Sequence, residues 1–122
     1  MAGVQRFEDL ECWKAARVLV REIFILCKKD LLRKDFDLKS QIRRAALSSM
    51  NNIAEGFGRS SPKELCYFLS VASASCAEVR SMLYVFLDMH IITQEEFTKY
   101  MQQTNQTQKL TKGFLRYLQS KN

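Results

Sequence analysis

The sequence is poor in the residues that form turns, with one proline and four glycines among 122 residues. Folds built from many short strands need such residues at frequent intervals, so this composition favours an all-helical protein. No stretch approaches the roughly 18 uninterrupted apolar residues of a membrane-spanning helix, and the N-terminus lacks the apolar core of a secretory signal. We therefore expect a single cytoplasmic domain, residues 1–122, without a membrane segment.

Groups suited to catalysis or metal binding are equally scarce. The chain has one histidine, His90, and four widely spaced cysteines without a CxxC pair (Cys12, Cys27, Cys66, Cys76). Structural zinc sites draw on closely spaced Cys and His ligands, and acid–base catalysis needs a base within reach of a nucleophile. We predict no enzyme, no cofactor and no metal site. The cysteines are expected to be buried thiols, and His90 to cap a helix end or interact with its dipole.

What the sequence has in quantity is helical periodicity. Apolar residues recur at three- and four-residue spacing in four segments, at about residues 9–32, 37–55, 62–89 and from 93 onward. The last segment is almost wholly polar over residues 102–109, which predicts a weak helix there. Because short links place consecutive helices antiparallel, the pattern predicts an all-α protein, an up-down-up-down four-helix bundle.

Signals for helix ends accompany these segments. The runs Ser-Pro-Lys-Glu at 61–64 and Thr-Gln-Glu-Glu at 93–96 carry a hydroxyl residue followed three positions later by glutamate, which predicts a capping box at each. The second segment runs into Gly56 and Gly58. We expect these glycines to stop the helix, since glycine readily adopts left-handed dihedrals.

The third segment has two apolar faces, more than the core of one small bundle requires. One face fits the intramolecular core, and the other has the spacing of a heptad-like seam against another helix. We predict that the second face is the interface of a homo-oligomer. Its residues are Tyr67, Val71, Ala74, Met82, Val85 and Met89, interrupted by Glu78.

The net charge of +6 is unevenly placed. Residues 28–44 carry seven basic and three acidic side chains, residues 45–96 are acidic on balance, and residues 97–122 carry five basic side chains and no acidic one. Such asymmetry indicates a polyanionic partner, although lysines and arginines also keep a surface soluble. Phosphate contacts need positive charge and give affinity without reading sequence. The candidate nucleic-acid-binding residues are Lys28, Lys29, Arg33, Lys34, Lys39, Arg43 and Arg44, with pairing of Arg43 and Arg44 to neighbouring acids as the structural alternative.

The turn after the second segment offers a second candidate anion site. Gly56-Phe-Gly-Arg59 has two glycines and an arginine, which could cradle a phosphate, but it lacks the lysine and following hydroxyl of a P-loop. A helix-to-helix turn in which Glu55 and Arg59 pair or cap the backbone is the favoured interpretation.

Several runs of residues resemble a known family. They are Gln41-Ile-Arg-Arg-Ala-Ala46, Asn52-Ile-Ala-Glu-Gly-Phe-Gly-Arg59, Lys63-Glu-Leu-Cys-Tyr-Phe-Leu69 and the opening Phe7-Glu-Asp-Leu-Glu-Cys-Trp-Lys-Ala-Ala16. Together they resemble the bacterial four-helix-bundle proteins encoded in 23S rRNA intervening sequences, often labelled ribosomal protein-like. The run Asn52-Ile-Ala-Glu-Gly-Phe-Gly-Arg59 is the most specific to that family.

The resemblance implies an up-down bundle that assembles as a homopentamer and has no recognised enzymatic activity. Related bundles include the accessory variability determinant of diversity-generating retroelements, a basic pentamer that works with a reverse transcriptase and nucleic acid. The function expected here is therefore an oligomeric bundle that binds RNA or DNA. The alternative is a scaffold whose partner is a protein such as a reverse transcriptase.

Overall fold

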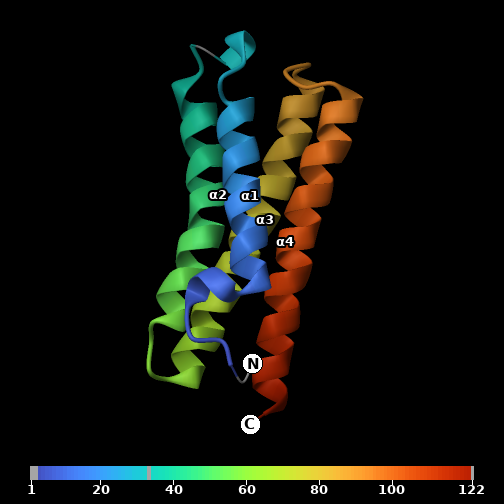
Figure 1. The fold of residues 1–122 in the computed structure, drawn as a ribbon. Coiled ribbons are helices and arrows are strands. Elements are labelled where there is room, and N and C mark those ends of the chain that lie inside the picture. Colours follow the sequence, from blue (N-terminus) through green and yellow to red (C-terminus); the bar gives the residue numbers. More distant parts are fainter. Residues whose placement is uncertain (1–2, 33, 122) are drawn as a thin grey trace.

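The computed structural model describes residues 3–32 and 34–121. Its long helices are α1 (Glu11–Leu26), α2 (Phe36–Phe57), α3 (Pro62–Asp88) and α4 (Gln94–Ser120), with short 3-10 turns η1 (Phe7–Asp9) and η2 (Asp30–Leu32). Figure 1 shows the long helices side by side and alternating in direction. The α1–α2 and α3–α4 links lie at one end, and the α2–α3 link lies at the other. The predicted up-down-up-down four-helix bundle is confirmed.

Two apolar clusters fill the interior. The cluster toward the α1–α2 and α3–α4 links includes Ile23, Ile42 and Phe86, each fully buried. The cluster toward the α2–α3 link is centred on Leu10 and Leu69. Burial of the apolar side chains of the helices, rather than helix propensity, supplies most of the stability of such a bundle.

The polar middle of α4 belongs to the continuous helix Gln94–Ser120, and part of it lies in the core. Thr104 and Thr107 are fully buried, and their hydroxyls donate to the carbonyls of Tyr100 (2.7 Å) and Gln103 (2.9 Å). The Gln103 amide donates to the Ala15 carbonyl of α1 at 3.0 Å. Buried polar groups that find partners cost little, and these partners are supplied by the helix itself and by its neighbour.

The first helix is shorter than its periodicity suggests, ending at Leu26 instead of near residue 32. Leu32 lies six residues beyond Leu26, so in a continued helix the two side chains would point about 120° apart, and Leu26 is itself in the core. The 3-10 turn η2 instead returns the chain, and Leu32 is 0% exposed. Burial of one leucine in the core thus favours the break.

The expectation that α2 stops at this pair of glycines is correct for Gly58 and wrong for Gly56, and the expected left-handed dihedral is absent. Gly56 lies inside the helix, and Gly58 caps it with a right-handed φ of −77°. Gly56 is instead a close-approach residue, since a Cβ built there would lie 2.7 Å from the Cβ of Phe68 on α3. Absence of a side chain at Gly56 therefore lets α2 and α3 touch.

The left-handed helix end belongs to His90, whose φ is 59°. The Ile91 N–H donates to the Phe86 carbonyl at 2.9 Å, and the His90 N–H donates to the Leu87 carbonyl at 3.0 Å. These two bonds form a Schellman motif at the end of α3. The prediction that His90 caps a helix end is confirmed through its backbone.

We expect His90→Gly to stabilise the protein by about 0.5–1 kcal/mol, because glycine adopts positive φ without the Cβ penalty that His90 carries. Chemical denaturation of the variant and the wild type measures the difference. An equal loss of stability would mean that the imidazole makes contacts that outweigh the backbone strain.

The capping box at α4 is complete. The Thr93 hydroxyl accepts from the Glu96 N–H at 3.1 Å, and the Glu96 carboxylate accepts from the Thr93 N–H at 2.9 Å. At α3 only half of the box is present: Ser61 accepts from the Glu64 N–H at 3.4 Å. The Glu64 carboxylate is instead 3.9 Å from the Arg59 guanidinium.

Glu96 also joins the two links at one end of the bundle, since its carboxylate lies 2.9 Å from the Lys29 ammonium. The hydrogen bond from Lys29, followed by that from the Thr93 N–H, lowers the pKa of Glu96 below its ordinary 4.5. A carboxyl whose pKa is lower in the folded than in the unfolded state stabilises the fold fully above the unfolded pKa. That contribution disappears as the pH falls through the folded pKa.

Accordingly, Glu96→Gln should lower the free energy of unfolding by about 1 kcal/mol at pH 7. The difference from the wild type should hold down to about pH 5 and shrink below pH 4.5, as the wild-type carboxyl takes up its proton. Urea unfolding between pH 3 and pH 7 measures this difference. A gap that stays the same at pH 3 would contradict the assignment.

Candidate nucleic-acid interface

The basic candidates lie at the end of the bundle that holds the α1–α2 link, and along the first turns of α2 (Figure 1). Lys28, Lys34 and Arg44 are exposed, whereas Lys39 and Arg43 are half-buried. Arg33 lies outside the described residues. Lys29 is held by its ion pair with Glu96, so its charge is already neutralised within the chain.

A hollow of about 280 Å³ lies between α1 and α2, lined by Phe24, Ser40, Arg43, Arg44 and Leu47. The Arg43 guanidinium is centred 5.7 Å from the Phe24 ring centroid, a distance at which a cation is attracted to a ring face. Arg44 donates to the Ser40 hydroxyl at 3.3 Å. The lining of the hollow therefore combines one aromatic ring with two guanidinium groups.

Arg43 and Arg44 have no acidic partner among the described residues. The ion pairs found in residues 3–32 and 34–121 use Arg6, Lys14, Lys29 and Arg59. Pairing with an acid of the same chain therefore does not account for these two arginines. Their charge stays available to an anion from outside.

Cations on α1 extend this surface, and grouping the charges by position in the chain missed them. Arg17 and Arg21 are exposed and lie four residues apart, which places them on one side of α1. Lys28, also exposed, follows in the turn after α1. The Arg17 guanidinium lies 5.8 Å from the Trp13 ring centroid. In the sequence, Arg17 and Arg21 are four residues apart and lie at helical spacing from Trp13 and Phe24. This pattern could have identified the two arginines as part of the surface.

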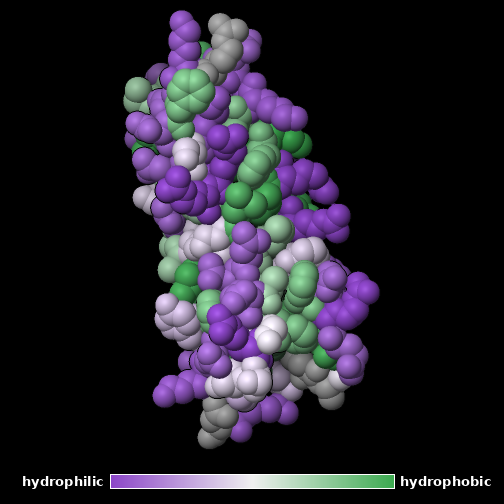
Figure 2. All heavy atoms as spheres, turned by 90° about the vertical axis from the view of Figure 1, so that its left-hand side faces the viewer, coloured by the Kyte–Doolittle hydropathy of each residue, from purple (hydrophilic) through white to green (hydrophobic). Residues whose placement is uncertain are grey.

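We call this surface the α1–α2 basic face and define it by Arg17, Arg21, Lys28, Lys39, Arg43 and Arg44. Rings accompany its cations, because the Lys39 ammonium also lies 5.1 Å from the ring centroid of Phe36. Phe36 is 72% exposed. The α2 side of the molecule, seen in Figure 2, carries hydrophilic and apolar residues interleaved rather than segregated. Aromatic and cationic groups mixed in this way suit a ligand that has both phosphates and rings.

The Cys27 thiol lies beneath this face. Burial raises its pKa, and the positive charges of Arg43 and Lys39 oppose the rise. Lys39 and Arg43, four residues apart on α2, thus both act on the same buried group.

The turn that carries the family motif is held by contacts within the bundle. The Asn52 amide donates to the Ser48 carbonyl at 2.8 Å and to the Ser48 hydroxyl at 2.9 Å. Glu55 pairs with Arg59 at 2.7 Å, and the Arg59 guanidinium lies 5.0 Å from the Phe68 ring centroid. With Gly56 against Phe68 and Gly58 as the helix cap, these contacts tie α2 to α3.

The second apolar face of α3 lies outside the monomer core. Tyr67 is 64% and Met89 66% exposed, Val85 and Ala74 are also exposed, and Val71 and Met82 are half-buried. Met82 additionally packs against the core cluster near the α3–α4 link. Exposed tyrosine, valine and methionine on one helix are an apolar surface of the kind that protein interfaces cover.

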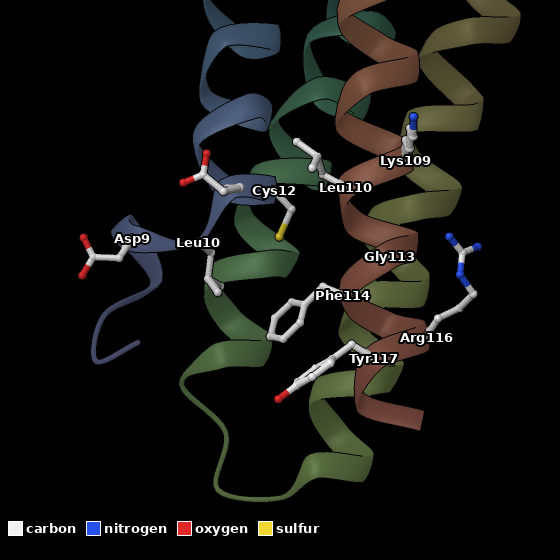
Figure 3. Close-up of a pocket in the computed structure, with 10 residues that line it drawn as sticks. Asp9, Leu10, Cys12, Lys109, Leu110, Gly113, Phe114, Arg116 and Tyr117 are labelled. Carbon is white, nitrogen blue, oxygen red and sulfur yellow. The ribbon is translucent and has the colours of Figure 1, made fainter. Parts of the chain in front are cut away.

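A second, larger pocket of about 500 Å³ lies at the opposite end, between the start of α1 and the last turns of α4. Figure 3 shows Leu10, Cys12 and Phe114 pointing toward it, with Lys109 and Arg116 directed away along α4. Burial raises the pKa of the Cys12 thiol to about 11. The thiol is therefore protonated at neutral pH and is a poor nucleophile.

The buried Cys76 thiol is similarly unreactive. Burial raises the pKa of Cys76 to about 12. In residues 3–32 and 34–121, no three histidine, cysteine, aspartate or glutamate side chains gather where they could hold a metal ion. None of the described helices combines the length and apolarity needed to cross a bilayer.

Comparisons with known proteins agree with the motifs and the fold. A model of the 23S rRNA-intervening sequence protein family matches residues 8–113. A solved structure from Bacteroides thetaiotaomicron, a protein of unknown function from the S23 ribosomal protein family, aligns with a TM-score of 0.79. The alignment has 20% sequence identity and covers 85% of this chain and 97% of that one. At that identity the likeness is one of fold, and no curated protein matches the chain. The family match spans the motifs quoted from α2 and α3 and most of the opening one, so the chain belongs to the 23S rRNA-intervening sequence protein family.

Proposed function

We propose that this protein is a non-enzymatic, homo-oligomeric helical bundle that binds RNA or other nucleic acid through its α1–α2 basic face. The observation that carries the proposal is the pair Arg43 and Arg44. They line an open hollow, beside an aromatic ring, and have no acidic partner among the described residues.

The physical basis is counterion release. A nucleic acid that contacts several lysines and arginines sheds condensed cations, and the resulting gain in affinity needs no base-specific contact. The α1–α2 basic face offers six cations on two neighbouring helices and the turn that follows α1. None of the six takes part in the ion pairs found among the described residues. A rigid helical pair can hold such charges along the path of a phosphate backbone.

Self-association supports the same function. The apolar face of α3, with Tyr67, Val85 and Met89 exposed, supplies the surface for it, and the family resemblance implies five copies. In a ring, each copy repeats the α1–α2 basic face around the symmetry axis. Modest contacts at each copy then add up through multivalency.

Fluorescence anisotropy with a labelled single-stranded RNA and a labelled DNA of the same sequence tests the proposal. We expect micromolar or tighter binding in 50 mM salt, with the mass of the oligomer determined by light scattering in the same buffer. An oligomer of intact mass that binds neither probe would overturn nucleic-acid binding. A monomer would overturn the assembly.

A further inference from the structure

Resting on the proposed function, we infer that the hollow between α1 and α2 receives one unpaired nucleotide. The protein would thereby select single-stranded or looped nucleic acid, with a base against Phe24 and its phosphate on Arg43 and Arg44. Three features of the hollow lead to this assignment.

The first feature is its chemistry. Phe24 and Leu47 are the apolar residues that line the hollow, and Arg43, Arg44 and Ser40 supply its hydrogen-bond donors. A nucleotide matches both parts of this lining, because the flat face of its base is apolar and its phosphate is anionic. An anion without a base would make no use of the ring, and an apolar ligand would leave two guanidinium groups without an acceptor.

The second feature is its size. At about 280 Å³ the hollow is slightly smaller than the pockets that enclose drug-sized ligands, so its volume suits one base better than a longer ligand. In a duplex the base faces are stacked on each other, so a ring set into the groove between two helices meets only the backbone. Contact between Phe24 and a base face therefore requires an unpaired nucleotide.

The third feature is repetition along α2. Phe36, Ser40, Arg43 and Leu47 recur at spacings of three and four residues and so share one side of the helix. Phe36 with Lys39 forms a second ring-and-cation pair, about two turns before Arg43. A single strand lying along α2 thus meets two such pairs in succession, the arrangement by which proteins stack successive bases.

The test compares two labelled DNA probes of equal length: oligothymidylate, and an oligonucleotide in which the bases are absent but the phosphates remain. We expect the wild type to bind oligothymidylate about tenfold more tightly than the abasic probe, as base–aromatic stacking predicts. In Phe24→Leu, which keeps an apolar side chain but removes the ring, the two affinities should approach each other. Phe114→Leu, which removes a ring from the opposite end of the molecule, is the matched control and should retain the tenfold preference.

A second variant leaves Phe24 and its packing in place. Ser40→Leu fills the hollow without changing any charge, so it should abolish the preference for oligothymidylate while the abasic probe still binds. Circular dichroism and melting temperature establish that each variant is folded.

The outcomes separate this inference from the proposed function. Equal affinity of the wild type for both probes, with steep salt dependence, would overturn the nucleotide site and leave phosphate binding intact. An unchanged preference in both Phe24→Leu and Ser40→Leu would place base contact elsewhere and also overturn the site. No binding of either probe would remove the proposed function, and this inference with it.

Discussion

Simultaneous reversal of Lys39, Arg43 and Arg44 to glutamate is expected to weaken nucleic-acid binding by at least about 100-fold at 100 mM salt. Each residue that contacts a phosphate releases counterions, and its loss reduces the salt slope by about 0.7 for a single-stranded probe. Reversal also introduces repulsion against the backbone. Anisotropy titrations with the single-stranded probe measure both effects.

The matched control reverses the same number of charges on another face. Lys109, Lys112 and Arg116 are the cations near the end of α4, where Lys109 and Arg116 border the large pocket. Their reversal gives the same change in net charge and should weaken binding far less. Equal losses in the two variants would show that binding responds to net charge and not to the α1–α2 basic face. Loss of the oligomer in the first variant would assign the two arginines a structural role.

Gly56→Ala is expected to destabilise the protein by about 2 kcal/mol, which is a fall in melting temperature of about 8 °C for a chain of this size. The new Cβ would lie 2.7 Å from the Phe68 Cβ and 3.1 Å from a Leu65 methyl. Both contacts are too short, and one involves an atom fixed to the α3 backbone, so the two helices must move apart. Overpacking of this kind costs about 3 kcal/mol, and the better helix propensity of alanine offsets about 1 kcal/mol.

Gly113→Ala provides the matched control, because Gly113 is also inside a helix but has no neighbouring atom within 4 Å of the position that a Cβ would take. Here only the difference in helix propensity remains, so the variant should gain up to about 1 kcal/mol. Urea unfolding of both variants measures the pair of effects. A gain in stability for Gly56→Ala would contradict the close approach of α2 and α3.

Local signals in the sequence were sufficient for most of the fold. Periodicity placed the helices, and the hydroxyl–glutamate spacing identified both N-terminal caps, because these are properties of residues three or four positions apart. Helix ends that depend on distant contacts were missed. The end of α1 depends on the burial of Leu32 in the core. The need for a glycine at position 56 depends on its close contact with Phe68 on the next helix.

In the candidate interface, too, features set by neighbouring residues were predicted from the sequence, and features set by distant contacts were missed. The cluster around Arg43 and Arg44 was visible as a run of charge in the chain. Arg17 and Arg21 were not grouped with it, because only the contact of Phe24 on α1 with Arg43 on α2 shows that this side of α1 adjoins α2. The partner of Lys29 is likewise Glu96, which is 67 positions further along the chain and cannot be paired with it from spacing alone.

The most direct measurement of the central claim is the dependence of affinity on salt, from 50 to 400 mM, for the purified protein and a single-stranded probe. With six cations on the α1–α2 basic face, we predict a slope of log K against log salt of about −4. The reversal of Lys39, Arg43 and Arg44 should reduce the magnitude of that slope by about 2. A slope near zero, or no binding at 50 mM salt, would contradict phosphate recognition and favour a scaffold whose partner is another protein.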